Sequence, residues 1–345
     1  MKIMLVGLGA IGQRHVRNLR ALYGSEIELI AYRARRQSPV LTDSLKVEEG
    51  SDLNTKYGIQ AYSDLEAALA QHPQAAFICN PTSLHISVAI QAARAGCHLF
   101  IEKPLSHNLD GIKELQSLVE LNHLVAYVAY QMRFHPCLKA ANAWMIAGKI
   151  GPVLGGRAEV GEYLPGWHTY EDYRQMYASR RELGGGVILS QIHEMDTLYW
   201  FFGLPRRVFS LGGHLSSLEI DVEDLASILM EFRVEGRTLP FHLHQDYLQR
   251  PPSRTVELIG DRGKILVDMA GLTARCYDQT GQLAEETNMK GFQRNQLFLD
   301  EMHHFMACLR GEAQPQVNLQ DGIQSLRMAL AARESMESGK VIELA

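Results

Sequence analysis

The sequence lacks the features that mark several classes of protein. No apolar run reaches the roughly 20 residues that cross a bilayer as a helix, so we predict no membrane segment. Met1 leads almost directly into a strand-like stretch, and we therefore expect no signal peptide and a cytoplasmic location. Cysteine is scarce: five residues are scattered without any Cys-x-x-Cys pair, which excludes a disulfide scaffold or a zinc ribbon and favours reduced thiols.

An excess of positive charge is also missing. The 34 Lys and Arg residues are outnumbered by 39 Asp and Glu residues, for a net charge of -5, and no run of like charges forms a tail. The chain offers no basic field, so we expect no nucleic-acid partner. Its 345 residues, 46% of them hydrophobic, are typical of a globular protein with two domains.

What the sequence does contain begins with a glycine turn. Apolar residues 3–6 precede Gly7-Leu8-Gly9-Ala10-Ile11-Gly12, and a helical pattern follows over 13–22. In a unit of strand, turn and helix, the first glycine permits the turn, the second lets a diphosphate approach the backbone, and the third lets helix and strand pack closely. The N–H groups of the helix N-terminus then face the phosphates. We predict a dinucleotide site.

The end of the second predicted strand, 26–32, bears on the choice of dinucleotide. An acidic residue there would bind the ribose hydroxyls of NAD, but the chain continues with Arg33, Ala34, Arg35 and Arg36. Guanidinium groups match a ribose phosphate, so we prefer NADP(H) over NAD(H), although arginines after a strand can also be merely solvated. The polar stretch 37–56 is expected to be an irregular surface insertion.

Strands and helices then alternate up to residue 130. We predict strands at 59–62, 75–79, 97–101 and 124–129, with helices at 64–70, 84–95 and 108–122, the first two capped by Ser63 and Ser83. This order predicts an α/β, doubly wound parallel sheet of the Rossmann type over 1–130. Ligands bind at the carboxyl ends of such strands, where Asn80, Thr82 and Lys103 are expected.

The remainder, 131–345, reads as a second α/β domain. Period-two patterns predict strands at 153–163, 208–214, 225–234, 239–247, 255–259, 264–267 and 273–277. Few helices interrupt them, which predicts a large, open, mostly antiparallel sheet with one face left for helices or for another subunit. A final helix at about 320–339 is expected to reach back towards the first domain.

Two stretches between these strands do not look like scaffold. The segment 166–181 mixes aromatic and hydrogen-bonding side chains, as sugar sites do, although a long surface loop is the alternative. The segment 187–202 reads as one amphipathic helix on which Ser190, His193 and Asp196 share a face. There His193 could exchange a proton, oriented by Asp196 or Glu194, or it could be a structural histidine.

Other polar groups leave their roles open. Arg250 and Arg254 flank a diproline turn, where an anionic substrate group or a simple salt bridge would suit them equally. His242, His244 and Asp246 share one face of a strand, but a metal site is less expected there than a contact with substrate or with a neighbouring subunit.

The ordered set of motifs resembles the Gfo/Idh/MocA family. It comprises the glycine fingerprint, Asn80-Pro81-Thr82 with His85, Glu102-Lys103-Pro104, Arg133 with His135-Pro136, and the triple glycine 184–186 before His193. The resemblance implies a nicotinamide cofactor and the oxidation or reduction of a secondary alcohol on a sugar, cyclitol or nucleotide sugar. It also implies a homodimer or homotetramer formed through the open sheets.

The same resemblance implies roles for individual residues. Lys103 matches the lysine that contacts the reacting hydroxyl, and His193 matches the histidine that acts as acid or base. The family usually has an aspartate four residues before that histidine, whereas here the segment is one residue shorter and Ser190 stands in the corresponding place. The chain is further similar to bacterial members of surface-glycan pathways in Trp167-His168, in 172–174 and in 250–254.

These arguments give the following assignments. We predict Lys103 and His193 as catalytic, and no metal ligands. The predicted cofactor-binding residues are Gly7, Gly9, Ala10, Ile11, Gly12, Arg33, Arg35, Asn80, Thr82, His85, Glu102, Lys103 and Gln131. The predicted substrate-binding residues are Arg133, Tyr163, Trp167, His168, Tyr173, Arg174, Ser190, His193 and Arg250. The expected activity is an NAD(P)-dependent oxidoreductase acting on a sugar, sugar acid or nucleotide sugar; a non-catalytic sensor of NADP and sugar, or a redox-neutral glycosidase acting by oxidation and elimination, is the alternative.

Overall fold

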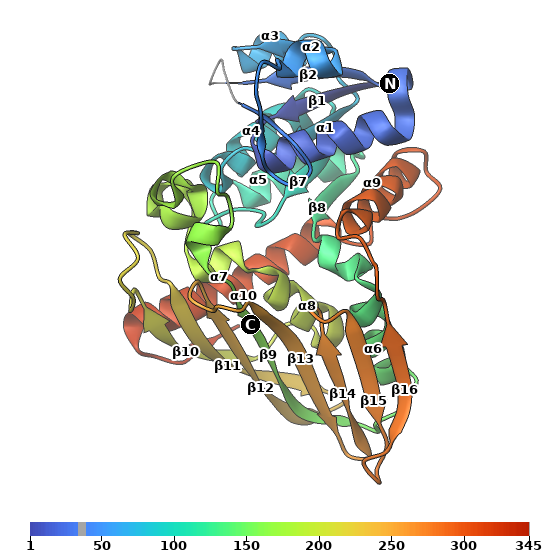
Figure 1. Ribbon diagram of the computed structural model, residues 1–345, viewed down its shortest axis with the longest axis vertical. Coiled ribbons are helices and arrows are strands. Elements are labelled where there is room, and N and C mark those ends of the chain that lie inside the picture. Colours follow the sequence, from blue (N-terminus) through green and yellow to red (C-terminus); the bar gives the residue numbers. More distant parts are fainter. Residues whose placement is uncertain (34–38, 345) are drawn as a thin grey trace.

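The computed structural model describes residues 1–33 and 39–344 (Figure 1). The first part of the chain forms a six-stranded parallel sheet in the order β5-β2-β1-β6-β7-β8. Its strands are β1 (Lys2–Val6), β2 (Glu28–Tyr32), β5 (Ile59–Tyr62), β6 (Ala75–Ile78), β7 (His98–Glu102) and β8 (Ala126–Ala129). Its helices are α1 (Ala10–Tyr23), α2 (Leu53–Tyr57), α3 (Leu65–Leu69), α4 (His85–Arg94) and α5 (Ile112–Leu121), with short 3-10 turns η1 (Gly24–Glu26) and η2 (Thr82–Leu84). The predicted Rossmann architecture is confirmed.

The central strands of this sheet are apolar because both of their faces are covered. All four residues of β6 are buried, as are the last four of β1, and the pairing of β1 with β2 and β6 is parallel throughout. Continuous apolar runs of this kind are what a sheet with helices on both faces requires. The arrangement brings the carboxyl ends of β1, β6 and β7 to one edge, where the predicted cofactor residues begin.

Three local expectations for this domain were wrong. The stretch 39–57 is ordered: β3 (Val40–Leu41) and β4 (Val47–Glu48) form a small hairpin, which the buried Gln13 holds by bonds to Pro39 O and Leu41 N. Asp64, not Ser63, caps α3, through a bond from Ala67 N. Ser83 caps no helix, because a 3-10 turn, η2, precedes α4 and occupies its first positions.

The second part of the chain forms a nine-stranded sheet in the order β16-β15-β14-β13-β9-β12-β11-β10-β17. Among the described residues of this sheet, β9 and β12 are the one parallel pair, so the predicted large and mostly antiparallel sheet is confirmed. The strands are β9 (Val153–Gly161), β10 (Arg207–Gly213), β11 (Leu225–Val234), β12 (Arg237–Asp246), β13 (Ser253–Gly260), β14 (Gly263–Asp268), β15 (Thr273–Tyr277), β16 (Leu283–Asn288) and β17 (Ile342–Glu343). Alternate residues are buried along β11 and β12, so one face of the sheet is packed and the other is largely exposed.

Helices cover the packed face and connect the two domains. They are α6 (Pro136–Ile146), α8 (His193–Phe202), α9 (Asn295–Leu309) and α10 (Leu319–Ser338). Figure 1 shows α10, in red, between the parallel sheet above and the large sheet below. Its fourth residue, Gly322, lies so close to Val128 of β8 that a Cβ there would stand 2.6 Å from the valine side chain. Helix α9 packs against α1, where Asn295 accepts a bond from Arg14.

The predicted single helix over 187–202 was wrong. The chain forms α7 (Val187–Ser190) and then α8, with Gln191 outside both. The Gln191 amide donates to Asp246 O and the Gln245 amide donates to Gln191 O, each within 2.9 Å. These two bonds fasten the break to β12, because burying Gln191 requires partners for its polar groups. His193 therefore begins a helix instead of lying inside one.

Two predicted absences can be compared with the described residues. None of the helices among residues 1–33 and 39–344 is long and apolar enough to cross a membrane. The five cysteines are all buried thiols without a disulfide.

Candidate active site

The glycine turn after β1 has the geometry of a diphosphate cradle. Gly7 has φ of 88°, and a Cβ on it would lie 3.0 Å from Asn80 N. A Cβ on Gly12 would lie 2.2 Å from Gly7 O, so both positions are closed to larger residues. At Gly9, by contrast, a Cβ would meet nothing within 4 Å, so this glycine faces open space. Helix α1 has no acidic residue in its first turn and no side-chain cap, which leaves its N–H groups for an anion.

Two arginines, Arg33 and Arg35, are predicted at the ribose of the cofactor. Arg35 lies outside the described residues. Arg33 follows β2 and is buried, with Nη1 3.5 Å from Asn54 Oδ1 and with Nη2 lacking any partner among the described residues. A buried donor without an acceptor is costly, so this nitrogen is placed to receive an oxygen from a ligand. The residues thus fit a dinucleotide at this edge of the sheet.

The predicted cofactor residue His85 has both ring nitrogens engaged. Nδ1 lies 2.9 Å from Pro104 O and Nε2 lies 2.8 Å from Asn80 O, and burial lowers the pKa of the ring. Neither nitrogen is free to bind the cofactor, so His85 instead fixes the turn after β6 to the turn after β7. Thr82, 2% exposed, packs against Gly184 of the second domain, where a Cβ would lie 3.0 Å from the threonine Cβ.

Glu102 and Lys103 end β7 and point to different partners. Glu102 Oε1 lies 2.6 Å from Nε2 of the fully buried His15 on α1, between the rings of Phe77 and Phe100. Lys103 extends into the space between the domains, where its Nζ donates to Ser190 O at 2.9 Å. The carboxylate therefore stays inside the first domain while the ammonium group meets the second.

Ser190 contacts Lys103 through its backbone and not its side chain. The Ser190 hydroxyl is buried without a partner among the described residues, and the Ser190 carbonyl, at the end of α7, accepts the hydrogen bond from Lys103 Nζ. Among the described residues, no carboxylate forms an ion pair with Lys103, and the hydrogen bond to Ser190 O is what holds its Nζ. Gln131, in η3 (Gln131–Phe134), is buried, and its side chain makes no hydrogen bond to the described residues.

His193 lies at the start of α8, beside this lysine. Its ring is 5.7 Å from the ring of Tyr130, and its Nδ1 is buried without a partner. Burial lowers the pKa of His193 well below its usual value, and the positive charges of Lys103, Arg254 and Arg294 lower it further. The imidazole is therefore neutral near pH 7, with a nitrogen available to accept a proton.

The carboxylates expected to orient His193 do not do so. Asp196 accepts two bonds from Arg133, at 2.7 and 2.9 Å, while Glu194 accepts one from Arg254 at 2.7 Å. Because helical neighbours point in different directions, each carboxylate meets an arginine from a different strand or turn. Arg133, predicted to bind substrate, is 5% exposed and also donates to Gln316 O, so it is an internal ion-pair residue.

The aromatic segment after β9 folds as a series of 3-10 turns. These are η4 (Leu164–Gly166), η5 (Tyr173–Gln175), η6 (Tyr177–Ser179) and η7 (Arg181–Leu183). At its start, Arg250 stacks over the Tyr163 ring at 3.9 Å and Trp167 packs edge-on to Tyr247. Aromatic contacts therefore hold Tyr163 and Trp167, which flank η4, against residues 247–250 that follow β12.

The rest of that set is bound locally. His168 Nδ1 lies 2.8 Å from Glu171 Oε1, and Arg174 forms a bidentate pair with Asp172. Tyr173 accepts a bond from Glu219 N, in the connection between β10 and β11. The structure therefore brings Lys103, Ser190 and His193 together, while His168 pairs within its own segment and Tyr173 and Arg174 also contact Glu219 of the β10–β11 connection.

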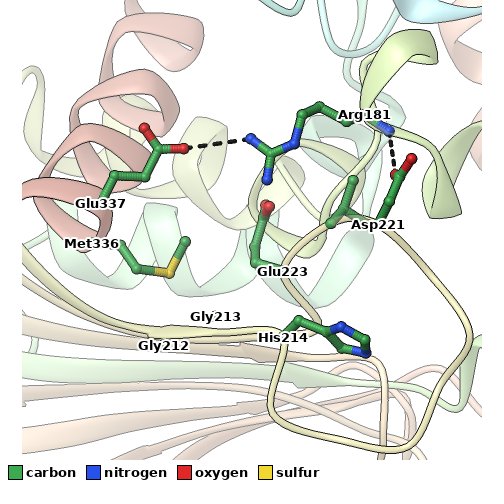
Figure 2. Close-up of a pocket in the computed structure, with 9 residues that line it drawn as sticks. Arg181, Gly212, Gly213, His214, Asp221, Glu223, Met336 and Glu337 are labelled. Atoms are coloured by element: carbon green, nitrogen blue, oxygen red, sulfur yellow. Dashed lines mark hydrogen bonds and ion pairs between the residues drawn. The ribbon is translucent and has the colours of Figure 1, made fainter.

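A cavity near these turns is separate from that cluster. Figure 2 shows its lining, which includes Arg181, Glu223 and Glu337, in a volume of about 290 Å³. Arg181 is held there by Glu337 at 3.6 Å and by a bond from its backbone N to Asp221. Neither Lys103 nor His193 lines it. The described residues include no group of three or more histidine, cysteine or acidic side chains placed to hold a metal ion.

Sequence reasoning missed one residue near His193. Arg294 immediately precedes α9, about one hundred residues after His193 along the chain, and no motif surrounds it. Arg254 was considered only as part of a loop, although it lies on β13 and pairs with Glu194. Neither position could be found from spacing, because contacts between distant elements set both.

Two models of one protein family match this chain. The model of an oxidoreductase family with an NAD-binding Rossmann fold matches residues 1–130, and the model of that family's C-terminal α/β domain matches 145–344. Myo-inositol 2-dehydrogenase of Thermotoga maritima is 24% identical over 100% of this chain and 98% of its own. The scyllo-inositol 2-dehydrogenase (NAD(+)) of Bacillus subtilis is 25% identical over 100% of this chain and 96% of its own.

A solved structure shares the fold over the whole chain. The WlbA dehydrogenase of Bordetella pertussis, solved with NADH and UDP-GlcNAcA, has a TM-score of 0.80 at 22% identity, and the match covers 100% of this chain and 99% of that one.

Proposed function

Because the chain belongs to the Gfo/Idh/MocA oxidoreductase family, we propose that it transfers a hydride between a nicotinamide cofactor and a secondary alcohol or ketone of a sugar, sugar acid or nucleotide sugar. The observation that carries this proposal is the meeting of Lys103 and His193, from separate domains, at the ligand-binding edge of the parallel sheet. The named activities of the inositol and UDP-sugar dehydrogenases, which match over nearly their whole length, support this class of substrate.

The two residues have complementary charges for this chemistry. A nicotinamide cofactor would supply the hydride acceptor or donor, with its diphosphate held at Gly9 and the N-terminus of α1. Neutral His193 accepts the hydroxyl proton when the alcohol is oxidised and returns it when the ketone is reduced. Lys103, positioned by its bond to Ser190 O, donates a second hydrogen bond to the reacting oxygen of the substrate. Its positive charge stabilises the negative charge that develops on that oxygen.

Substitution of these two residues tests the proposal. We expect Lys103→Ala and His193→Ala each to lower kcat by about 10²–10⁴-fold, the usual range for a proton-transfer group, with the Kd of NADPH nearly unchanged. The exposed Lys113→Ala and His303→Ala are matched controls that should keep wild-type turnover. Turnover is followed by nicotinamide absorbance against a panel of sugars and nucleotide sugars, and unchanged rates for both active-site variants would reject the assignment.

For the cofactor, NADP(H) is our proposed preference over NAD(H). Its support is the absence of a carboxylate after β2 and the buried Arg33 Nη2 that lacks an acceptor. We expect Arg33→Ala to raise the KM for NADP about tenfold and to leave the KM for NAD unchanged, because only NADP carries the extra phosphate. Asn54→Ala, which removes the existing partner of Arg33, is the control, and a lower KM for NAD than for NADP in the wild type would overturn the preference.

A homo-oligomer formed through the open face of the large sheet completes the proposal. Leu211, Leu229 and Ile259 lie on that face and are 61%, 55% and 48% exposed. Exposed leucines on neighbouring strands favour a protein partner over water. We expect light scattering to give a dimer or tetramer and Leu229→Glu to dissociate it, whereas a wild-type monomer at micromolar concentration would exclude it.

A further inference from the structure

The connection between β10 and β11, residues 214–224, contacts the chain at successive points on its way to α7. Alternate residues of the connection make these contacts. They are a bond from Glu219 N to the Tyr173 hydroxyl at 3.2 Å, a bond from Arg181 N to Asp221 Oδ1 at 2.7 Å, and two bonds from α7 to Glu223. The connection therefore supports the whole approach to α7, and Glu223 is the residue that reaches the helix itself.

Glu223 accepts hydrogen bonds from the first two residues of α7. Its backbone O accepts from Val187 N at 3.0 Å, and its side-chain Oε1 accepts from Ile188 N at 3.3 Å. The first N–H groups of a helix have no partner within the helix. A single residue of the connection thus supplies partners for two of these groups, one through its backbone and one through its side chain.

The carboxyl group of Glu223 is enclosed at this point. The residue is 6% exposed, and glutamate is rarely buried so completely without a partner. Gly186, the residue before α7, has φ of 107°, and a Cβ on it would lie 2.2 Å from Glu223 Oε1. Figure 2 shows Glu223 on the wall of the cavity, while Arg181 is directed to Glu337 and Asp221. Among the described residues, the hydrogen-bond partner of this carboxyl group is therefore α7.

Helix α7 transmits this contact to Lys103. The helix is one turn long, and Ser190 N, at its end, donates to Gly186 O at 2.9 Å. The Ser190 carbonyl then accepts from Lys103 Nζ at 2.9 Å. Beyond the helix, Gln191 is bonded to β12. So short a helix has little stability of its own, so contacts from outside it determine where Ser190 O lies.

We propose that Glu223 is a positioning residue for Lys103: by fixing the start of α7, it sets the place at which Ser190 O holds the ammonium group. The effect of this residue on turnover rests on the proposed function, whereas its effect on the placement of Lys103 does not. A shift of about 1 Å in a catalytic group can lower a rate about a hundredfold, even when the cause lies far from the reacting atoms. A loosened α7 should therefore lower turnover without touching the cofactor site.

A purely structural role is the alternative, in which the Glu223 carboxyl group stabilises the fold and leaves Lys103 in place. Glu231 of β11 provides the comparison. Its side chain is 15% exposed and accepts a bond from Arg207 at 2.7 Å. Substitution of either glutamate removes a largely buried carboxylate from the same domain, but only Glu223 is bonded to α7.

The first measurement follows Lys103 directly. Brief acetylation of the cofactor-free protein with acetic anhydride, followed by mass spectrometry, gives the labelling of Lys103 relative to the exposed Lys113. Glu223→Met fills the same space without a strong acceptor, whereas Glu223→Gln keeps an acceptor oxygen. We expect Glu223→Met to raise the labelling ratio about threefold, because a less firmly held helix opens more often. Glu223→Gln and the control Glu231→Met should keep the wild-type ratio.

The second measurement is turnover by nicotinamide absorbance. We expect Glu223→Met to lower kcat about tenfold with the Kd of NADPH unchanged, and Glu223→Gln to restore most of the rate. Glu231→Met should keep the wild-type kcat. Circular dichroism confirms that each variant is folded, and Glu223→Ala, which also lacks an acceptor, carries the same expectations where Glu223→Met does not fold.

Each other outcome has a definite meaning. A wild-type labelling ratio in folded Glu223→Met rejects the positioning role. An equal rise in Glu231→Met or in Glu223→Gln also rejects it, because the cause is then a general loosening and not the lost hydrogen bond. If the ratio rises as expected while kcat stays unchanged, or if the wild type turns over no sugar, the placement of Lys103 by Glu223 stands and the proposed catalytic role of that lysine fails.

Discussion

Helix α8 carries two buried carboxylates, and each is paired with an arginine from elsewhere, but the two pairs differ in how completely they are closed. Asp196 and Arg133 have side chains that are 1% and 5% exposed, and a bidentate contact joins them. Asp196 also accepts from Ser325, and Arg133 donates to Gln316 O. This pair fastens α8 to η3 and α10 and has little capacity left for a ligand.

The pair of Glu194 and Arg254 is open on one side. A single hydrogen bond joins them, Glu194 Oε2 has no partner, and the arginine side chain is 24% exposed. Its charge consequently reaches His193 and His135, whereas that of Arg133 is compensated by Asp196. Arg254 acts on these histidines because Glu194 leaves part of its guanidinium uncovered, whereas Asp196 covers that of Arg133.

The largest difference should appear in stability when each arginine is removed. Arg133→Ala leaves Asp196 without its partner in the interior, and we expect a loss of about 3–5 kcal/mol in the free energy of unfolding. Arg254→Ala breaks one bond at a partly exposed site and should cost only about 1–3 kcal/mol. Urea denaturation of both variants measures the two values, and equal losses would contradict the distinction.

Acid should destabilise the protein through His135, which the charge of Arg254 reaches. His135 accepts a bond from Cys137 N as the cap of α6, and burial together with Arg254 lowers its pKa to about 4. In the unfolded chain the pKa of this histidine is near 6.5, so the unfolded state binds the proton more readily than the folded state does. The stability that neutral His135 contributes is therefore fully present above about pH 6.5. It is lost as the pH falls towards 4, by roughly 2–3 kcal/mol in the free energy of unfolding.

Unfolding curves between pH 7 and pH 4 measure this slope. His135→Asn keeps a capping acceptor and does not titrate, so the variant should lose stability less steeply with acid. A slope equal to that of the wild type would show that His135 is not the group responsible.

Neutralising the carboxylates should give smaller and unequal effects. Asp196→Asn weakens two arginine bonds and one serine bond, and we expect a cost of about 2 kcal/mol. Glu194→Gln keeps an acceptor for Arg254, and burial already raises the pKa of Glu194, so its cost should stay below about 1 kcal/mol. Thermal unfolding of the two variants compares them, and a larger cost for Glu194→Gln would reverse the ranking.

The smallest effect concerns the pH dependence of the oxidation rate on its acid side. Arg254→Gln removes a positive charge that lowers the pKa of His193, so the pH below which oxidation slows should rise by about half a unit. Arg262→Gln, an exposed arginine outside the cleft, should leave the limb in place. A limb that does not move in Arg254→Gln would show that this charge is screened from His193.

The sequence by itself determined the parts of this protein that depend on local geometry. The strand, glycine turn and helix over 2–23 could be read directly, because the approach of Gly12 to Gly7 leaves no room for a side chain. The alternation of strands and helices identified the parallel sheet, and period-two patterns identified most strands of the second sheet. Lys103 and His193 were predicted as catalytic through the resemblance of their motifs to a known family, and that role remains a prediction.

Only the tertiary structure decided which side chains meet. Hydrogen bonds between Gln191 and β12 broke the helix expected over 187–202, and contacts across more than sixty residues turned Arg133 from an expected substrate ligand into the partner of Asp196. Arg254 of β13 likewise gained its partner, Glu194 of α8, only when these two elements packed together. The physical reason is that periodicity records the face a residue occupies, whereas a charge acquires its partner only when separate elements pack together.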